Sequence, residues 1–373
     1  MHPHSKATIL YYYGWQHFDT GSPKALAGLI GALDRSRFEP VFLARGDGPL
    51  IEALLSKGVK IVRKDVGEVS YRRPADGVRR IFRMVTCLDE IQPDLVHVMG
   101  FDRNLDLVLA AWMRHIPVVL HVHTPEGADF RNLHRFAATK VLFCSEAERQ
   151  AFQHLQRISA KTEVLYNTVD VKRFADAVPR RRELGLKSHQ IAIGTIAQIS
   201  KRKGIDIILE VARLLRDDHL RFLIVGPDGP GEEQFAAEMR ARAVTDPALR
   251  ARVRFLGARQ DIPELLKSVD LFFLPTRAEP FGIVFVEAMA AGIPVVAPRI
   301  GGVPEIVNSG EIGHLVSDFT PTAFASTIAQ VLALPDRGRA MAGKAQDSVR
   351  ERFDSSVIGQ KLSGVYADVL RLG

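Results

Sequence analysis

Short runs of Val, Ile and Leu alternate with longer amphipathic segments along almost the whole chain. This alternation predicts strand–helix–strand units, because parallel strands are buried on both faces and therefore read as continuous apolar runs. The predicted strands of the first half are residues 8–13, 41–44, 59–62, 95–99, 118–122, 140–144 and 163–166. Those of the second half are residues 191–197, 220–225, 253–256, 271–274 and 294–297. We therefore expect two doubly wound α/β sheets.

A charged segment over residues 179–189, in which Gly185 ends a short predicted helix, separates the two series of strands. We expect an N-terminal Rossmann-like domain over residues 1–185 and a second one over residues 186–352. Residues 353–373 are predicted to form a helix that crosses back to the first domain. A chain of 373 residues is long enough for two domains of ordinary size.

The composition, with 46% hydrophobic and 25% charged residues, is that of a folded globular protein. Its two cysteines, Cys87 and Cys144, are too few for a disulfide framework. The longest apolar run, residues 281–297, is interrupted by Glu287 and two helix breakers, so no membrane-spanning segment is predicted. The amino-terminal residues lack the pattern of a secretory signal. We expect a cytoplasmic protein.

The most informative segment follows the strand at residues 271–274 and reads PTRAEPFGIVFVEAMAAGIP. A helix is predicted to start near Ile283, which puts Glu279 in the entry loop and Glu287 one turn inside the helix. The free N–H groups of a helix start favour an anion such as a diphosphate. Two carboxylates beside that anion would repel it unless they bind hydroxyl groups, such as those of a sugar. Alternatively, Glu279 caps the helix and Glu287 lies on a solvated face.

The pair of Glu residues, with Pro-Phe-Gly after the first, resembles the signature of family-four retaining glycosyltransferases of the GT-B fold. The likeness continues in GGVPEIV (residues 301–307), YNTVD (166–170) and PDLVH (93–97). It implies two Rossmann-like domains facing across a cleft and a hexosyltransferase that uses a nucleotide-diphosphate sugar, with no cofactor and no metal. It also implies that Glu279 contacts the donor sugar and that Glu287 holds the nucleotide ribose.

The loop over residues 194–204 is the second segment of this likeness. In the family, an Arg just after the strand and a Lys before a Gly grip the donor diphosphate. Lys203 matches, but Gln198 stands where the family has Arg. Either Arg202 or Lys201 replaces that Arg, or Lys203 and helix amides hold most of the diphosphate. A solvated cluster is the alternative, although cations at the positive end of a helix are unfavourable without an anion. The other predicted donor-binding residues are Gly21, Ser22, Gly226, Leu256, Gly257, Phe281, Gly282, Ile283 and Val284.

Two histidines, His121 and His123, point to the same side of a predicted strand. They could be half of a metal site, but no nearby Cys or carboxylate run completes one. The resemblance implies that a His in this loop lies next to the donor sugar and steadies positive charge at its anomeric carbon. His123 is the better match and is predicted to be catalytic together with Glu279, whereas His121 is expected to be a packed core residue.

The net charge of +7 lies mostly in the first half of the chain. Much of it comes from five cations, Arg72, Arg73, Arg79, Arg80 and Arg83, of which the last three share one side of a predicted helix. Helical periodicity places the apolar residues Val78, Ile81, Phe82, Val85 and Leu88 on the opposite side. This helix either covers the sheet with a solvated basic side or docks on an anionic membrane or a phosphorylated acceptor. The predicted acceptor-binding residues are His17, Phe18, Asp19 and Glu126.

The sequence thus predicts a retaining, metal-independent glycosyltransferase that moves a sugar to a hydroxyl acceptor. The expected acceptor is a glycan or lipid-linked glycan of cell-surface polysaccharide or glycoconjugate synthesis, reached at the inner face of the membrane. A nucleotide-sugar epimerase or hydrolase on the same fold is the alternative. A basic nucleic-acid-binding protein is a more remote one, because no zinc, helix-turn-helix or aromatic RNA-binding motif accompanies the charge.

Overall fold

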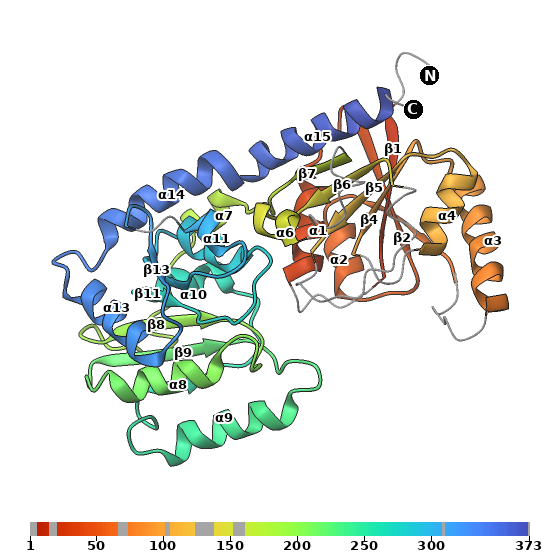
Figure 1. Cartoon of the computed structure of the whole chain (residues 1–373). Coiled ribbons are helices and arrows are strands. Elements are labelled where there is room, and N and C mark those ends of the chain that lie inside the picture. Colours follow the sequence, from red (N-terminus) through yellow and green to blue (C-terminus); the bar gives the residue numbers. More distant parts are fainter. Residues whose placement is uncertain are drawn as a thin grey trace. The chain divides into compact units, whose positions relative to one another are not determined.

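A computed structural model describes residues 6–14, 21–65, 74–100, 105–123, 138–151, 161–307 and 310–371. The predicted residues His17, Phe18, Asp19, Arg72, Arg73 and Glu126 lie outside these ranges. The chain divides into two compact units (Figure 1). Unit 1 comprises residues 1–168 and 355–373, and unit 2 comprises residues 169–354.

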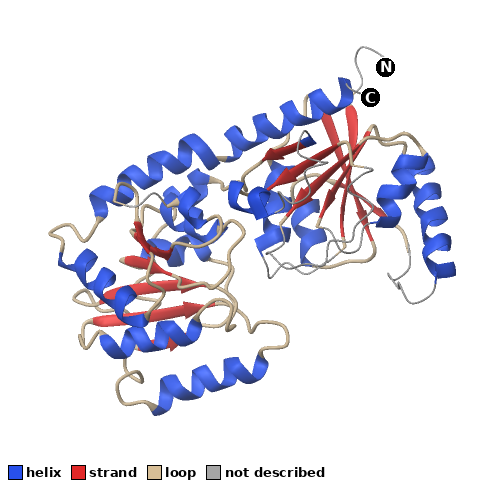
Figure 2. Cartoon of the chain, in the orientation of Figure 1, coloured by secondary structure: helices blue, strands red, loops and turns tan. Residues whose placement is uncertain are grey.

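The core of unit 1 is a seven-stranded parallel sheet of order β3-β2-β1-β4-β5-β6-β7. Its strands are β1 Ala7–Tyr13, β2 Phe38–Ala44, β3 Lys60–Arg63, β4 Leu95–Met99, β5 Val118–Val122, β6 Lys140–Phe143 and β7 Thr162–Val164. The described helices of this unit are α1 Gly21–Gly31, α2 Pro49–Leu55, α3 Pro74–Ile91, α4 Leu105–Met113, α6 Glu146–Ala151 and α15 Ser355–Arg371. One apolar cluster joins the sheet to α1, α2 and α15, and another joins its opposite face to α3 and α4. Helices therefore cover both faces (Figure 2).

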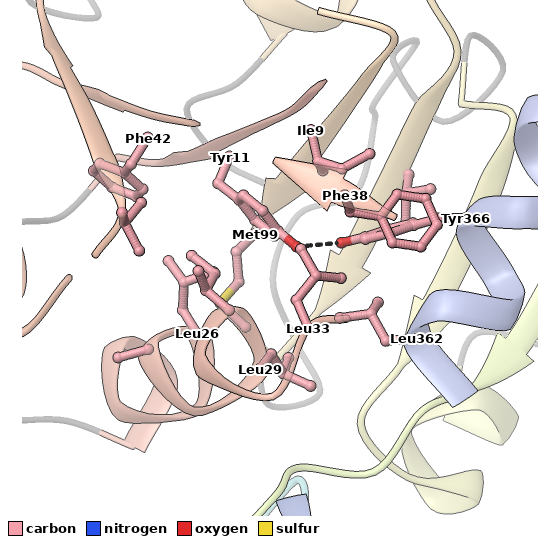
Figure 3. Close-up of a cluster of buried hydrophobic side chains, with 14 of the residues drawn as sticks. Ile9, Tyr11, Leu26, Leu29, Leu33, Phe38, Phe42, Met99, Leu362 and Tyr366 are labelled. Atoms are coloured by element: carbon pink, nitrogen blue, oxygen red, sulfur yellow. Dashed lines mark hydrogen bonds between the residues drawn. The ribbon is translucent and has the colours of Figure 1, made fainter. Parts of the chain in front are cut away.

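The terminal helix α15 belongs to unit 1, where Leu362 and Tyr366 are fully buried. The Tyr366 hydroxyl lies 2.8 Å from the hydroxyl of Tyr11 in β1, as Figure 3 shows. At Gly359 the helix passes so close to α1 that a Cβ atom would lie 2.1 Å from the carbonyl oxygen of Ala32. The last segment of the chain thus completes the core of the first unit.

Unit 2 contains a six-stranded parallel sheet of order β10-β9-β8-β11-β12-β13. Its strands are β8 Ile191–Ile196, β9 Leu220–Val225, β10 Val253–Phe255, β11 Leu271–Phe273, β12 Val295–Pro298 and β13 His314–Val316. Its described helices are α7 Val171–Ala175, α8 Ile205–Leu214, α9 Glu233–Thr245, α10 Ile262–Ser268, α11 Ile283–Ala290, α12 Val303–Ile306, α13 Pro321–Ala333 and α14 Arg339–Phe353. The prediction of two doubly wound parallel sheets is confirmed. The sequence analysis missed β13, which has three residues of which only Val316 is buried.

The division between the units falls after Thr168, earlier in the chain than the predicted division near residue 185. The connecting segment packs on unit 2, because the Val169 amide donates to the Phe353 carbonyl at 3.0 Å and Arg181 pairs with Asp270 at 2.9 Å. Periodicity finds the strands on each side of such a segment, but it carries no information on which sheet the segment packs against.

The buried and exposed sides of helix α3 differ from the predicted ones. Arg80 is 5% exposed and pairs with Asp106 of α4, with the Tyr12 hydroxyl 3.4 Å from its guanidinium. Val78 and Phe82, predicted to be packed, are 54% and 59% exposed. The prediction was wrong for these residues because a buried ion pair, which periodicity cannot detect, turns Arg80 toward α4.

Arg79 and Arg83 of the same helix are exposed, as the sequence predicts. The exposed side of α3 is therefore mixed, with two cations beside two apolar side chains. Among the residues described, no helix combines the length and hydropathy needed to span a bilayer.

Candidate functional site

The site of unit 2 lies where the strand order reverses, between β8 and β11. In open parallel sheets ligands bind beyond the carboxyl ends of the strands at such a reversal. The loops after these two strands contact each other, since the Arg277 amide donates to the Arg202 carbonyl at 2.7 Å. Gly204 has a φ of 72°, and a Cβ there would lie 2.0 Å from the Pro275 carbonyl oxygen. Only glycine permits this close approach of the two loops.

Lys203 and Glu279, predicted from separate motifs, are in direct contact. The Lys203 ammonium pairs with the Glu279 carboxylate, and the two side chains are 14% and 12% exposed. Lys203 precedes α8 and Glu279 precedes α11, so the pair joins the two loops. In the described part of the chain no helix amide donates to the Glu279 side chain, so the alternative of a helix cap has no support.

The backbone of Glu279 is held by the segment after β12. The Gly302 amide donates to the Glu279 carbonyl at 3.1 Å. Gly301 has a φ of 49°, and a Cβ there would lie 2.2 Å from the same carbonyl oxygen. The Gly-Gly motif of the sequence analysis thus acts on the site indirectly, by fixing the loop that carries Glu279.

Glu287 lies on the more open side of α11. The helix is buried around most of its circumference, whereas Ile283 and Glu287, four residues apart on one side, are half-buried. Gly282 is the N-cap in a left-handed conformation, and it has no side chain to block the first turn. The helix therefore presents a carboxylate and its amino-terminal amides without a bulky neighbour at the cap.

The remaining predicted donor-binding residues of unit 2 fall into two groups. Gly226 and Gly257 come together after β9 and β10, where the Gly226 amide donates to the Gly257 carbonyl at 2.9 Å, and the neighbouring Leu256 is half-buried. Phe281 and Val284 are 2% and 9% exposed, so they offer a ligand little surface.

Two further candidates lie in the loop after β8. Gln198 is half-buried, and the exposed Arg202 donates to the Ala278 carbonyl at 3.1 Å. Arg202 thus lies against the loop that carries Glu279. The sequence analysis missed a polar pair at the same place: the Arg277 guanidinium binds both oxygens of Asp206, at 2.8 and 2.7 Å. These residues are far apart in the chain, so no local spacing indicates the pair.

In unit 1, the half-buried His123 ends a row of aromatic rings whose other members, Tyr11, His97 and His121, are buried. Ring centroids are 5.2 Å apart for Tyr11 and His97, 5.5 Å for His97 and His121, and 4.2 Å for His121 and His123. The Tyr366 hydroxyl lies 2.6 Å from His97 Nδ1. His121 is fully buried, as expected of a core residue.

Burial lowers the pKa of His97 to about 3 and that of His123 to about 4. Burial, together with the neighbouring rings of His123 and His97, also places the pKa of His121 well below its usual value. Within the described ranges, neither nitrogen of His121 has a partner in hydrogen-bond geometry. All three rings are therefore neutral at pH 7.

Gly21 and Ser22 are the first residues of α1, which follows β1 at the reversal of the first sheet between β1 and β4. Gly21 is exposed and Ser22 is half-buried. Within the described ranges, no group of three or more His, Cys, Asp or Glu side chains is arranged to hold a metal ion.

The two doubly wound parallel sheets match the fold of GT-B glycosyltransferase structures, and the Lys203 and Glu279 loops lie at the strand reversal of the second sheet. Residues 21–173 match the family described as Glycosyltransferase Family 4, and residues 179–348 match Glycosyl transferases group 1. The chain belongs to glycosyltransferase family 4.

Among curated proteins, N-acetyl-alpha-D-glucosaminyl L-malate synthase of Bacillus anthracis is 31% identical over 293 residues, which are 74% of this chain and 75% of that protein. D-inositol 3-phosphate glycosyltransferase of Corynebacterium kroppenstedtii is 32% identical over 223 residues, 57% of this chain. That match spans about half, 49%, of the corynebacterial enzyme.

Among solved structures, Anabaena Alr3699/HepE in complex with UDP and glucose has a TM-score of 0.82 at 24% identity, over 96% of this chain and 99% of the other. WaaG, a glycosyltransferase involved in lipopolysaccharide biosynthesis, has a TM-score of 0.71 at 17% identity, over 96% and 99% of the two chains. At these identities the structural likeness shows the fold alone.

Proposed function

We propose that this protein transfers a sugar from a nucleotide-diphosphate sugar to a hydroxyl group of an acceptor, with retention of anomeric configuration. The observation that carries the proposal is the convergence of Lys203 and Glu279 at the strand reversal of unit 2, with Glu287 on the following helix. Among the structures that share the fold, an Anabaena protein is in complex with UDP or with UDP-glucose, which supports a nucleotide-sugar donor.

In this proposal the donor diphosphate binds the Lys203 ammonium and the amino-terminal amides of α11. Lys203 is already paired with Glu279, so the phosphate must take over part of this interaction. The freed Glu279 carboxylate then accepts hydrogen bonds from sugar hydroxyls. Arg202, at the edge of the same loop, supplies a second cation where Gln198 provides none. These preorganised charges stabilise the leaving diphosphate, so the proposed reaction needs no metal ion.

Glu287 is proposed to bind the ribose. A carboxylate has two oxygens that accept hydrogen bonds from two neighbouring hydroxyls, so a half-buried Glu287 selects a ribonucleotide. An analogue lacking one hydroxyl would leave the carboxylate partly unpaired, at a cost of about 1–3 kcal/mol.

The sugar is transferred on the face from which the diphosphate departs. As the bond from the anomeric carbon to the phosphate oxygen breaks, the acceptor oxygen forms its bond to that carbon and its proton passes to the departing phosphate oxygen. Neither Glu279 nor Glu287 is then a nucleophile. The neutral ring of His123, whose pKa burial lowers to about 4, is suited to steadying positive charge at the anomeric carbon without repelling it.

For the acceptor we propose a glycan or lipid-linked glycan of cell-surface polysaccharide or glycoconjugate synthesis. The role of WaaG in lipopolysaccharide biosynthesis supports this choice. The names of the curated relatives favour a second candidate, a small anionic acceptor comparable to L-malate or inositol 3-phosphate.

We further propose that the enzyme is cytoplasmic and binds the inner face of the membrane through α3. Exposed Arg79 and Arg83 beside exposed Val78 and Phe82 combine the two features that bind anionic lipid surfaces. Co-sedimentation with phosphatidylglycerol vesicles should fall at least fivefold in a double Arg79→Gln, Arg83→Gln variant. It should be unchanged in Arg350→Gln, which alters an exposed arginine of α14. Equal binding of all three proteins would contradict this role of α3.

The transfer itself is tested with a panel of nucleotide sugars. A donor at 100 times its dissociation constant should stabilise the protein by about 2.7 kcal/mol, seen as a raised melting temperature. The stabilising donor is then incubated with and without candidate acceptors, and the product is analysed by NMR for its anomeric configuration. Turnover without an acceptor would favour the epimerase or hydrolase alternative, and an inverted product would contradict retention.

A further inference from the structure

Arg277 joins the loop that carries Glu279 to the element that carries Lys203. Its guanidinium donates two hydrogen bonds to the Asp206 carboxylate, at 2.8 and 2.7 Å. Asp206 lies in the first turn of α8, three residues after Lys203, and Arg277 lies two residues before Glu279. The ion pair therefore runs beside the Lys203–Glu279 contact and connects the same two segments.

Three other contacts of Arg277 reinforce this connection. Its backbone amide donates to the Arg202 carbonyl at 2.7 Å, and its Nη1 atom also donates to the Lys201 carbonyl. Its guanidinium lies over the Phe319 ring, 6.0 Å from the centroid. One side chain thus binds a helix, a loop and an aromatic ring, which restricts the conformations that the loop can adopt.

The charges of the pair suit this arrangement. Partial burial is the largest single influence on the pKa of Asp206 and raises it, but the hydrogen bonds and charge of Arg277, together with backbone amides of α8, outweigh it. The pKa is therefore lowered and the carboxylate stays ionised at neutral pH. A carboxylate in the first turn of a helix is further stabilised by the helix dipole. Only the planar guanidinium of arginine offers two parallel donors to such a carboxylate, so lysine is not equivalent here.

We propose that Arg277 and Asp206 are positioning residues of the transfer reaction, which hold the Glu279 loop in register with Lys203. The inference rests on the proposed function and adds to it two residues that themselves touch no substrate. Glu279 is expected to contact the sugar and Lys203 the diphosphate. A shift of the Glu279 loop should therefore impair the chemical step more than it impairs nucleotide binding.

The test compares Arg277→Gln, Asp206→Asn and the double variant with the wild type. Misplacement of a reacting group by about 1 Å can lower a rate by roughly 100-fold. We expect kcat to fall at least tenfold, while the Kd of the free nucleoside diphosphate stays within twofold. The double variant should be no slower than the worse single variant, because both substitutions remove one interaction. Arg277→Lys, which keeps the charge, should have an intermediate kcat.

A matched control is available on the same helix. Arg242 of α9 pairs with Glu210, one turn after Asp206 in α8, and these side chains are 30% and 37% exposed, against 35% and 30% for Arg277 and Asp206. Arg242→Gln should therefore keep the wild-type kcat. A wild-type kcat in Arg277→Gln, or a loss of nucleotide affinity that parallels the loss of kcat, would overturn the positioning role.

Hydrogen exchange provides a readout that does not depend on activity. The Gly302 amide donates to the Glu279 carbonyl, so it reports on the order of the Glu279 loop. We expect this amide to exchange at least tenfold faster in Arg277→Gln than in the wild type or in Arg242→Gln, and unchanged exchange would overturn the inference. If the wild type transfers no sugar from any donor, the proposed function fails while the exchange result still stands. If the wild type is active and the variants keep its kcat, the positioning inference alone fails.

Discussion

Lys203 and Glu279, which lie in different loops at the strand reversal of unit 2, form an ion pair whose side chains are only 14% and 12% exposed. Each residue neutralises the other when no ligand is bound. A diphosphate that binds Lys203 must therefore compete with a carboxylate of this protein. Because of this competition, substitutions of the two residues should have different effects on nucleotide affinity.

Glu279→Gln removes the anion that competes for Lys203. We expect free nucleoside diphosphate to bind at least as tightly as it binds the wild type, while sugar transfer falls by about 100-fold. Lys203→Met removes the cation, so both the nucleotide affinity and the transfer rate should fall, the affinity by about tenfold. Isothermal titration calorimetry with UDP measures the nucleotide affinity, and a transfer assay measures the rate of sugar transfer. Wild-type turnover in both variants would contradict the assigned roles.

The stability of the same variants distinguishes the cost of an unpaired buried charge from the loss of sugar transfer. Each single substitution leaves one charge largely buried without its partner, which should lower the free energy of unfolding by about 3 kcal/mol. The double variant Lys203→Met, Glu279→Gln should regain part of this stability but none of the activity. Lys344→Met, which alters an exposed lysine of α14, is the control and should match the wild type in both measurements.

Glu287→Ala should weaken donor binding by removing the acceptor of the ribose hydroxyls. We expect the donor KM to rise about 5- to 150-fold, which corresponds to about 1–3 kcal/mol. The wild type should discriminate against a 2′-deoxy donor, whereas the variant should bind both donors equally weakly. Undiminished discrimination in the variant would show that Glu287 does not bind the ribose.

The buried histidines predict a loss of stability in mild acid. Burial lowers the pKa of His97 to about 3 and that of His123 to about 4, both from 6.5, and lowers that of His121 as well. Below pH 6.5 the unfolded chain therefore binds protons that the folded chain does not. The free energy of unfolding should fall as the pH drops from 6.5 to 4.5, by up to about 1.4 kcal/mol per pH unit for each histidine.

Urea unfolding at several pH values between 7.5 and 4.5 measures this slope. Carboxyl groups with a lowered pKa, such as Asp206 and Asp261, lose their stabilising effect only near and below their ordinary value of 3.8, so they contribute little in this window. His121→Leu removes one of these rings, so the number of protons taken up on unfolding, which sets the slope, should fall by about one. A slope equal to that of the wild type would show that His121 does not titrate as described.

Two glycines of α15 form a matched pair for the packing of this helix. A Cβ at Gly359 would lie 2.1 Å from the Ala32 carbonyl oxygen, whereas a Cβ at Gly364 would meet nothing within 4 Å. Gly359→Ala should therefore push α15 from α1 and lower stability by about 1–3 kcal/mol. Gly364→Ala should be neutral or stabilise the protein by up to about 1 kcal/mol through helix propensity. Equal melting temperatures of the two variants would contradict this packing.

The strands and the two Glu residues of the site could be predicted from the sequence, because each depends on a local pattern. Most strands of the two sheets contain a short apolar run, and all were predicted apart from the three-residue strand β13. Glu279 and Glu287 could be identified because they lie eight positions apart in one segment with a characteristic Pro-Phe-Gly. Patterns of this kind lie within about twenty residues of sequence, so they can be recognised without knowledge of the fold.

Contacts between distant segments could not be predicted in this way. Arg80 lies on what periodicity treats as a basic face, but its pairing with Asp106 buries it and leaves Phe82 exposed. In the same way, the sequence contains no sign that Arg277 binds Asp206. Such pairs depend on which loops and helices come together, and this depends on the order of the strands.

The sequence by itself determined the fold class, the family and the chemical types of the candidate site residues, because apolar periodicity and motif spacing are local properties of a chain. Only the tertiary structure decided how those residues are held. The strand order β8–β11 brings the Lys203 and Glu279 loops together, and close contacts at Gly204 and Gly301 fix their backbones. Ion pairs and close packing are interactions between segments far apart in the chain, so they exist only once the sheet has formed.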